Sequence, residues 1–303
     1  MASIIQVLTQ NIFPIFLVAG FGFALRRWRG LDKHTLSSVV FYCLSPCLVF
    51  SLLVNSQLPG EELTDLALFT VAAILSMGLL GFVVARLLRF ERRDTTALMI
   101  LLMFVNGGNY GLTLNRLRFG DEGLARAMVY YVTSTLMLYT IGVFLASMGQ
   151  LSWRQTLAKL GRLPVVYAAV LAVLVYRFSL PVPAPLMRGI EVAGAGAIPV
   201  MILVLGMQMA DLHGQFHLRL AIPAVTLRLL LGPVLAVLLA TVLGLQGLSR
   251  STAIIEASMP PAVITIILAT EFDLQATAVT SIVVVATLLS PLTLALTINL
   301  LGL

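Results

Sequence analysis

Two clusters of helix-breaking residues interrupt apolar runs of this 303-residue chain: residues 106–111 (Asn-Gly-Gly-Asn-Tyr-Gly) and residues 258–261 (Ser-Met-Pro-Pro). Glycine raises the entropic cost of a helix, and proline removes a backbone donor and clashes with the preceding turn, so each cluster predicts local unwinding. In lipid, an unwound backbone is tolerated only where protein or a water-filled cavity surrounds it. Matching breaks in two halves of a chain indicate a substrate site at the middle of the membrane, and therefore a transporter. The residues expected to shape the breaks are Gly107, Gly108, Gly111, Pro260 and Pro261.

The polar side chains of these clusters suit the binding of a carboxylate. Asn106 and Asn109 offer amide donors, while Tyr110 and Ser258 offer hydroxyl groups. Each half-helix that follows a break begins with unpaired N–H groups and partial positive charge, which makes an anion site without a cationic side chain. The alternative is that the asparagines only satisfy the freed backbone. Because amides at this depth are costly unless used, we expect these four residues to bind substrate.

Two ionisable residues also fall inside the apolar runs. Glu256 lies one turn before Pro260, and Arg228 lies close to Pro233. An ionisable residue within the membrane is a functional hypothesis by default. Glu256 is therefore a candidate for proton coupling, with Arg228 as its candidate partner. The alternatives are that the two residues form a structural pair, or that Glu256 reaches water on the outer side.

Composition identifies the class of protein. With 59% hydrophobic and 11% charged residues, against roughly 25% charge in soluble domains, the chain is predicted to be an integral membrane protein. Its net charge of +6 is dispersed among short loops, so no nucleic-acid partner is expected. The two cysteines, Cys43 and Cys47, lie in an apolar run without further metal ligands. We therefore expect neither a metal nor a cofactor.

Hydropathy predicts ten spans with short loops between them. The loops that follow the odd-numbered spans hold twelve Lys and Arg residues, and the other loops hold six. The positive-inside rule places the odd loops in the cytoplasm and both termini outside, which for a bacterial chain means the inner membrane. The predicted spans are Ile4–Leu25, His34–Val54, Asp65–Leu88, Thr95–Leu117, Leu124–Met148, Pro164–Phe178, Leu186–Ala210, Leu220–Gly244, Ser251–Thr270 and Leu274–Leu300.

An internal repeat relates the two halves. Residues 44–49 resemble residues 197–202 and, at nearly the same offset, the glycine cluster aligns with the proline pair. The predicted units are residues 1–148, a cytoplasmic linker at 149–163, and residues 164–303. Because five spans is an odd number, the second unit enters from the opposite side. The expected fold is an all-α polytopic membrane protein with ten transmembrane helices, arranged as two inverted five-helix repeats in which broken helices four and nine cross.

The chain resembles the auxin efflux carrier family, which includes bacterial malate and malonate permeases and plant PIN-type auxin exporters. The resemblance covers nearly the whole length. Residues 13–22 look like the opening of the family, and Pro46 and Pro199 occupy its second and seventh spans. The most specific signatures are residues 106–112, 119–120, 123–125 and 257–262.

The resemblance implies a scaffold and a mobile crossover domain that moves like an elevator. It also implies that Asn106 is the asparagine that contacts a carboxylate. The family usually has a proline two residues after Gly111, where this chain has Thr113, so the first break must rely on its glycines. A homodimer is compatible with the family, although no residue pattern argues for one.

These patterns predict a secondary carrier of small organic anions, such as mono- or dicarboxylates or auxin-like acids, that works by alternating access. The alternatives are a channel, a receptor without flux, and a sodium-coupled symporter of the bile-acid type, although the acidic and glutamine-rich motifs expected of that symporter are missing. An enzyme is not expected, because His34, His213 and His217 lie in loops or at span ends. The substrate, the direction of transport and the driving ion are not specified by the sequence.

Overall fold

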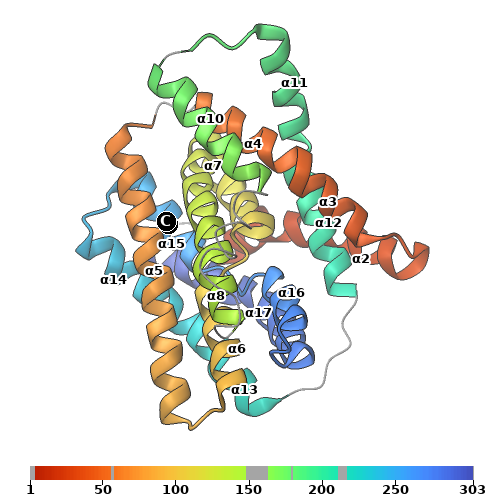
Figure 1. Ribbon diagram of the computed structural model, residues 1–303, viewed down its shortest axis with the longest axis vertical. Coiled ribbons are helices and arrows are strands. Elements are labelled where there is room, and N and C mark those ends of the chain that lie inside the picture. The colour runs from red at the N-terminus through yellow and green to blue at the C-terminus, as the bar shows by residue number, and fades with distance from the viewer. Residues whose placement is uncertain (1–3, 56–57, 148–162, 179, 211–216, 303) are drawn as a thin grey trace.

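The computed structural model describes residues 4–55, 58–147, 163–178, 180–210 and 217–302, and every regular element in this part of the chain is helical (Figure 1). The predicted linker at 149–163 lies outside the described residues except for its last position. The first half contains α1 (Ile4–Gln6), η1 (Val7–Ile12), α2 (Phe13–Arg29), α3 (Lys33–Val39), η2 (Val40–Leu44), α4 (Ser45–Asn55), α5 (Gly60–Leu87), α6 (Arg92–Met103), η3 (Gly107–Gly111), α7 (Leu112–Met137), η4 (Leu138–Gly142) and α8 (Val143–Ala146), where η denotes a π-helical segment. The second half contains α10 (Pro164–Phe178), α11 (Ala184–Ala195), α12 (Ala197–Ala210), α13 (Leu218–Thr226), η5 (Leu227–Leu231), α14 (Gly232–Val242), α15 (Gly247–Ala257), α16 (Ile264–Glu271) and α17 (Ala276–Leu301).

Three of the π-helical segments have a proline as their cause. Pro14, Pro46 and Pro233 each lie two residues after the end of η1, η2 and η5. A proline ring clashes with the carbonyl four residues earlier, and that carbonyl lies inside the π-helical segment in each case. The wider turn accommodates the ring without ending the helix.

Seven helical stretches in the described chain are long and apolar enough to cross a membrane, and α10 is a shorter apolar helix. The fourth and ninth predicted spans are each divided by a break, the fourth after α6 and the ninth between α15 and α16. A further change of direction occurs inside α7 at Gly120, whose φ of 70° and ψ of −159° suit only glycine. The count of ten spans and the inverted repeat therefore stay predictions.

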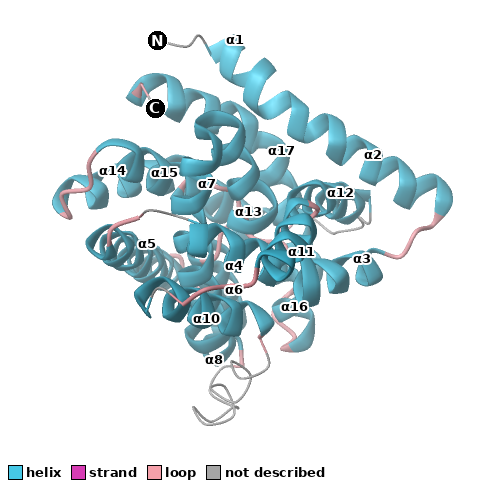
Figure 2. Cartoon of the chain, turned by 90° about the horizontal axis from the view of Figure 1, so that it is seen from above, coloured by secondary structure: helices cyan, strands magenta, loops and turns pink. Residues whose placement is uncertain are grey.

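The outer helices present apolar stripes. On α17, Leu288, Leu292 and Leu296 are exposed at four-residue spacing and therefore share one face. Exposed leucines also follow one another along α5, and Val234, Leu238 and Val242 do so along α14. Large exposed apolar surfaces on a helical protein indicate contact with lipid. α5 stands on one side of the molecule and α2 on the other (Figure 1), while η1 packs against α17 near the two chain ends (Figure 2).

The helices α2 and α12 approach each other closely. A Cβ atom at Gly22 would lie 2.0 Å from the Leu203 carbonyl oxygen, and one at Gly206 would lie 1.7 Å from the Ala19 carbonyl oxygen. Each backbone therefore occupies the space that a side chain of the other would need. Small residues at such a crossing allow membrane helices to approach closely.

We expect Gly206→Ala to destabilise the protein by about 1–3 kcal/mol, because the added methyl group overpacks a backbone contact. The measurement is the thermal unfolding midpoint of the detergent-solubilised protein. Gly20→Ala on α2 is the matched control, since nothing lies within 4 Å of its added Cβ. Equal midpoints for the two variants would contradict the tight α2–α12 contact.

Candidate functional site

The two breaks pair with each other through their backbones. The Asn106 N–H donates to the Pro260 carbonyl, and the Ala262 N–H donates to the Phe104 carbonyl, each over 2.8 Å. The unwound segments thus run antiparallel, as two short strands would. Each segment satisfies polar groups that the other leaves free, which lipid would not do.

A buried arginine joins the ends of the two half-helices that precede the breaks. Arg228 on η5 is 2% exposed, and its Nη1 donates to the Leu102 carbonyl of α6 over 2.7 Å. Its Nη2 donates to the carbonyl of Ala257, the last residue of α15. These carbonyls carry the partial negative charge of two helix C-termini, so one guanidinium neutralises both. A side chain at Gly232 would displace it, because a Cβ there would lie 2.7 Å from Nη2.

Glu256 contacts the glycine break. Its side chain is fully buried, and the Asn115 Nδ2 donates to Oε1 over 3.0 Å. A Cβ atom at Gly107 or Gly111 would lie 2.7 or 2.4 Å from Oε2, so these glycines leave room for the carboxyl group. The sequence-based alternative of a Glu256–Arg228 pair is not what the structure shows, since each residue has a different set of hydrogen-bond partners.

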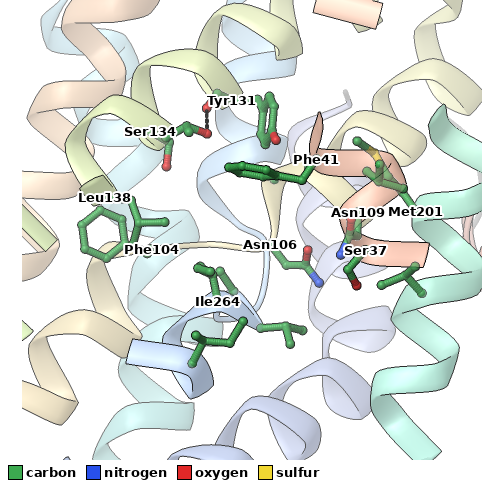
Figure 3. A pocket seen from close by; sticks show the side chains of 18 of the residues that line it. Ser37, Phe41, Phe104, Asn106, Asn109, Tyr131, Ser134, Leu138, Met201 and Ile264 are labelled. Atoms are coloured by element: carbon green, nitrogen blue, oxygen red, sulfur yellow. Dashed lines mark hydrogen bonds between the residues drawn. The ribbon is translucent and has the colours of Figure 1, made fainter. Parts of the chain in front are cut away.

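A cavity of about 450 Å³ lies at the paired breaks, between α3, η2, α7, α12 and α16, and its lining includes residues 104–109 of the fourth span and Ala262 and Val263 of the ninth. Figure 3 shows the Asn106 amide extending into it toward Ser37 and Asn109. Asn106 is 4% exposed, and its Nδ2 has no hydrogen-bond partner among the described residues. The Asn106 amide is therefore a buried donor that a ligand in the cavity can pair with.

Apolar and neutral polar groups form the rest of the lining. Phe104 and Leu138 form one side and Met201 lies on another (Figure 3). None of the described lining residues is Asp, Glu, Lys or Arg. At the start of α3, next to the lining residue His34, the Asp32 carboxylate caps the helix. The Asp32 carboxylate accepts hydrogen bonds from the Thr35 hydroxyl and from the backbone N–H groups of His34 and Thr35, and these bonds lower its pKa.

The structure brings together only part of the substrate-binding set predicted from the sequence. Asn106 and Asn109 line the cavity with Gly107 and Gly108. Tyr110 does not line it; its ring is fully buried, edge-on to Phe16, with centroids 5.9 Å apart. Ser258 does not line it either, and its hydroxyl donates to the Ile254 carbonyl within α15. Among the break residues, Gly111, Pro260 and Pro261 also lie outside the lining.

A second cavity, of about 730 Å³, lies at the opposite end of the second predicted span from the first cavity. The first cavity touches residues 34–42 of the second predicted span, and the second touches residues 48–55. Between them, the Ser45 and Tyr131 hydroxyls lie 3.4 Å apart. The lining of the second cavity includes Arg116, Asp121, Glu122, Arg126 and Glu191.

Long apolar helices, two paired helix breaks and a cavity lined by both breaks place this chain in the class of membrane transport proteins. A family model described as "Membrane transport protein" matches residues 7–298. The chain belongs to this family, the auxin efflux carriers that its motifs resemble, and is an integral multi-pass membrane protein.

Two archaeal relatives extend over nearly the whole chain. One, described as an uncharacterized transporter of Methanothermobacter thermautotrophicus, is 28% identical over 95% of this chain and 96% of its own length. The other, also described as an uncharacterized transporter, comes from Methanocaldococcus jannaschii and is 21% identical over 88% of this chain and 89% of its own length. These descriptions name transport as the activity but give no substrate.

We expect Arg228→Met to lower the thermal unfolding midpoint in detergent. It removes two hydrogen bonds from a charged donor, each contributing about 1.5–3 kcal/mol, and leaves two helix C-termini uncapped. Arg228→Lys is expected to recover little, because one ammonium group lacks the planar fork that reaches both carbonyls. Arg29→Met, which changes an exposed arginine at the end of α2, is the control. An unchanged midpoint in Arg228→Met would show that the hydrogen bonds of Arg228 to the ends of α6 and α15 do not stabilise the fold.

Proposed function

We propose that the protein is a secondary carrier of small organic anions, such as mono- or dicarboxylates or auxin-like acids, and that the anion binds in the cavity at the fourth-span break. The observation that carries this proposal is the buried Asn106 Nδ2, which faces the cavity without a partner among the described residues. A buried donor left unpaired is costly unless a ligand completes it. A carboxylate oxygen is an acceptor of the right kind.

The backbone adds to the attraction. Gly108 and Asn109 line the cavity in the first turn of η3, where N–H groups have no partner within the helix. The partial positive charge of this helix end favours an anion. No carboxylate among the described lining residues opposes it. At about 450 Å³, the cavity has a typical size for a small-molecule site.

The two cavities support alternating access. They lie at opposite ends of the second predicted span, and the Ser45–Tyr131 contact lies between them. A substrate at the break is thus open to one cavity and separated from the other. We propose that the paired breaks move as a unit against α2, α4 and α12, in an elevator-like motion within ten spans that form two inverted repeats. From the loop charges, we propose that the first cavity opens to the cytoplasm and that both termini lie outside.

We expect Asn106→Ala to lower kcat/KM for anion flux roughly 10- to 100-fold, the equivalent of one hydrogen bond to a charged group. Asn106→Asp keeps the shape of the side chain but places a like charge beside the anion, so it should reduce flux further. The measurement is counterflow of labelled malate, malonate and indole-3-acetate in proteoliposomes. Asn109→Ala should also weaken binding, because Asn109 lines the same cavity.

Asn299→Ala is the matched control, because Asn299 lies near the end of α17 and does not line the cavity. Unchanged flux in Asn106→Ala would contradict the proposal that the anion binds at Asn106. Flux that does not saturate and shows no counterflow would indicate a channel. Uptake that requires a sodium gradient would favour the symporter of the bile-acid type.

A further inference from the structure

A carboxyl group is buried directly behind the break that carries Asn106. Glu256 Oε2 lies against Gly107, which follows Asn106 in the chain, and against Gly111 one turn later. Glu256 does not line the cavity, so it is not a direct substrate ligand there. Its charge nevertheless lies close to the anion site in a region that water does not screen, where electrostatic effects are strong.

The hydrogen bonds around Glu256 leave a place for one proton. Asn115 Nδ2 donates to the Gly111 carbonyl over 3.1 Å and to Glu256 Oε1 over 3.0 Å, which uses both amide hydrogens. Glu256 Oε2 and Asn115 Oδ1 are buried and have no donor among the described residues. A proton on the carboxyl group turns it into a donor, and the unpaired Asn115 Oδ1 is a buried acceptor in the same cluster.

The charged groups around α15 do not neutralise Glu256. Arg228 donates to the Leu102 and Ala257 carbonyls, and no ion pair to Glu256 occurs in the described part of the chain. Near the start of α15, the Ser249 hydroxyl donates to the Glu62 carboxylate, which also forms an ion pair with Arg126. The buried titratable groups on the elements around α15 are Tyr110 of η3, Tyr130 of α7 and Arg228 of η5, and the Glu62–Arg126 pair lies beside Ser249. The other titratable groups on α5 and α7 are Glu61, Asp65, Arg86, Arg116, Arg118, Asp121, Glu122 and Tyr131.

We propose that Glu256, held in place by Asn115, binds one proton together with the organic anion, which makes the carrier a proton–anion symporter. This inference rests on the proposed function. An ionised Glu256 repels an anion at Asn106, and protonation removes that repulsion. Because such coupling is reciprocal, the bound anion also favours the proton, and couplings of this kind typically change affinity by about 5- to 150-fold.

The test uses proteoliposomes and labelled malate, with malonate as a second substrate. In the wild type, an acidic exterior should drive accumulation, and KM should fall as the pH is lowered from about pH 8 to about pH 6, where ordinary Asp and Glu side chains with pKa values near 4 stay ionised. Because the second carboxyl group of each substrate starts to bind a proton toward pH 6, each KM is compared with that of Glu256→Gln at the same pH. Glu256→Gln is permanently neutral and similar in shape. It should retain counterflow without a gradient, lose accumulation driven by the pH gradient, and show a KM that does not change with pH.

Glu61→Gln, at the exposed start of α5, is the matched control and should behave as the wild type does. Accumulation by Glu256→Gln under a pH gradient would overturn the inference, as would sodium-driven uptake that this substitution abolishes. If Glu256→Gln does not fold, a wild-type KM that is independent of pH overturns it. Wild-type counterflow without any response to pH contradicts the inference alone, whereas absence of counterflow for every substrate contradicts the proposed function.

Discussion

The backbone pairing of the two unwound segments is the interaction on which the rest of the structure depends. Broken helices expose N–H and C=O groups, and each group left unpaired in hydrocarbon costs several kcal/mol. Here the segments of residues 104–106 and 260–262 supply each other's partners. Neither break is satisfied alone, so the two halves of the chain must meet at this point. The cavity and the buried charges are arranged around that meeting.

The helix ends at the breaks lie in different surroundings according to the sign of their partial charge. The C-terminal ends of α6 and α15 both face the guanidinium of Arg228. The N-terminal end of η3 faces the cavity with the Asn106 amide. Negative helix ends therefore meet a fixed cation, while a positive helix end remains for a ligand. Glu256 lies between these regions, against the glycines, where a change in its charge acts on the anion site.

The sequence predicted the position of the breaks and of Asn106, because glycine and proline act locally on the helix. Asn115, one turn after Gly111, has no pattern in the sequence that marks it, because its role depends on contact with a residue of another span. The partners of Arg228 could not be derived, since hydropathy gives depth along a helix but not its rotation. Tyr110 and Ser258 lie outside the cavity for a similar reason: an irregular break changes the direction in which the following side chains point.

The proline pair has a consequence for how the paired segments can move. A strand pair can slip by one residue only if the neighbouring backbone positions offer replacement donors. Pro260 and Pro261 have no N–H group, and the Met259 N–H already donates to the Glu256 carbonyl, so Ala262 is the donor on this side. The pairing therefore has a single register. Sliding of one segment along the other would therefore leave buried backbone donors and acceptors without partners.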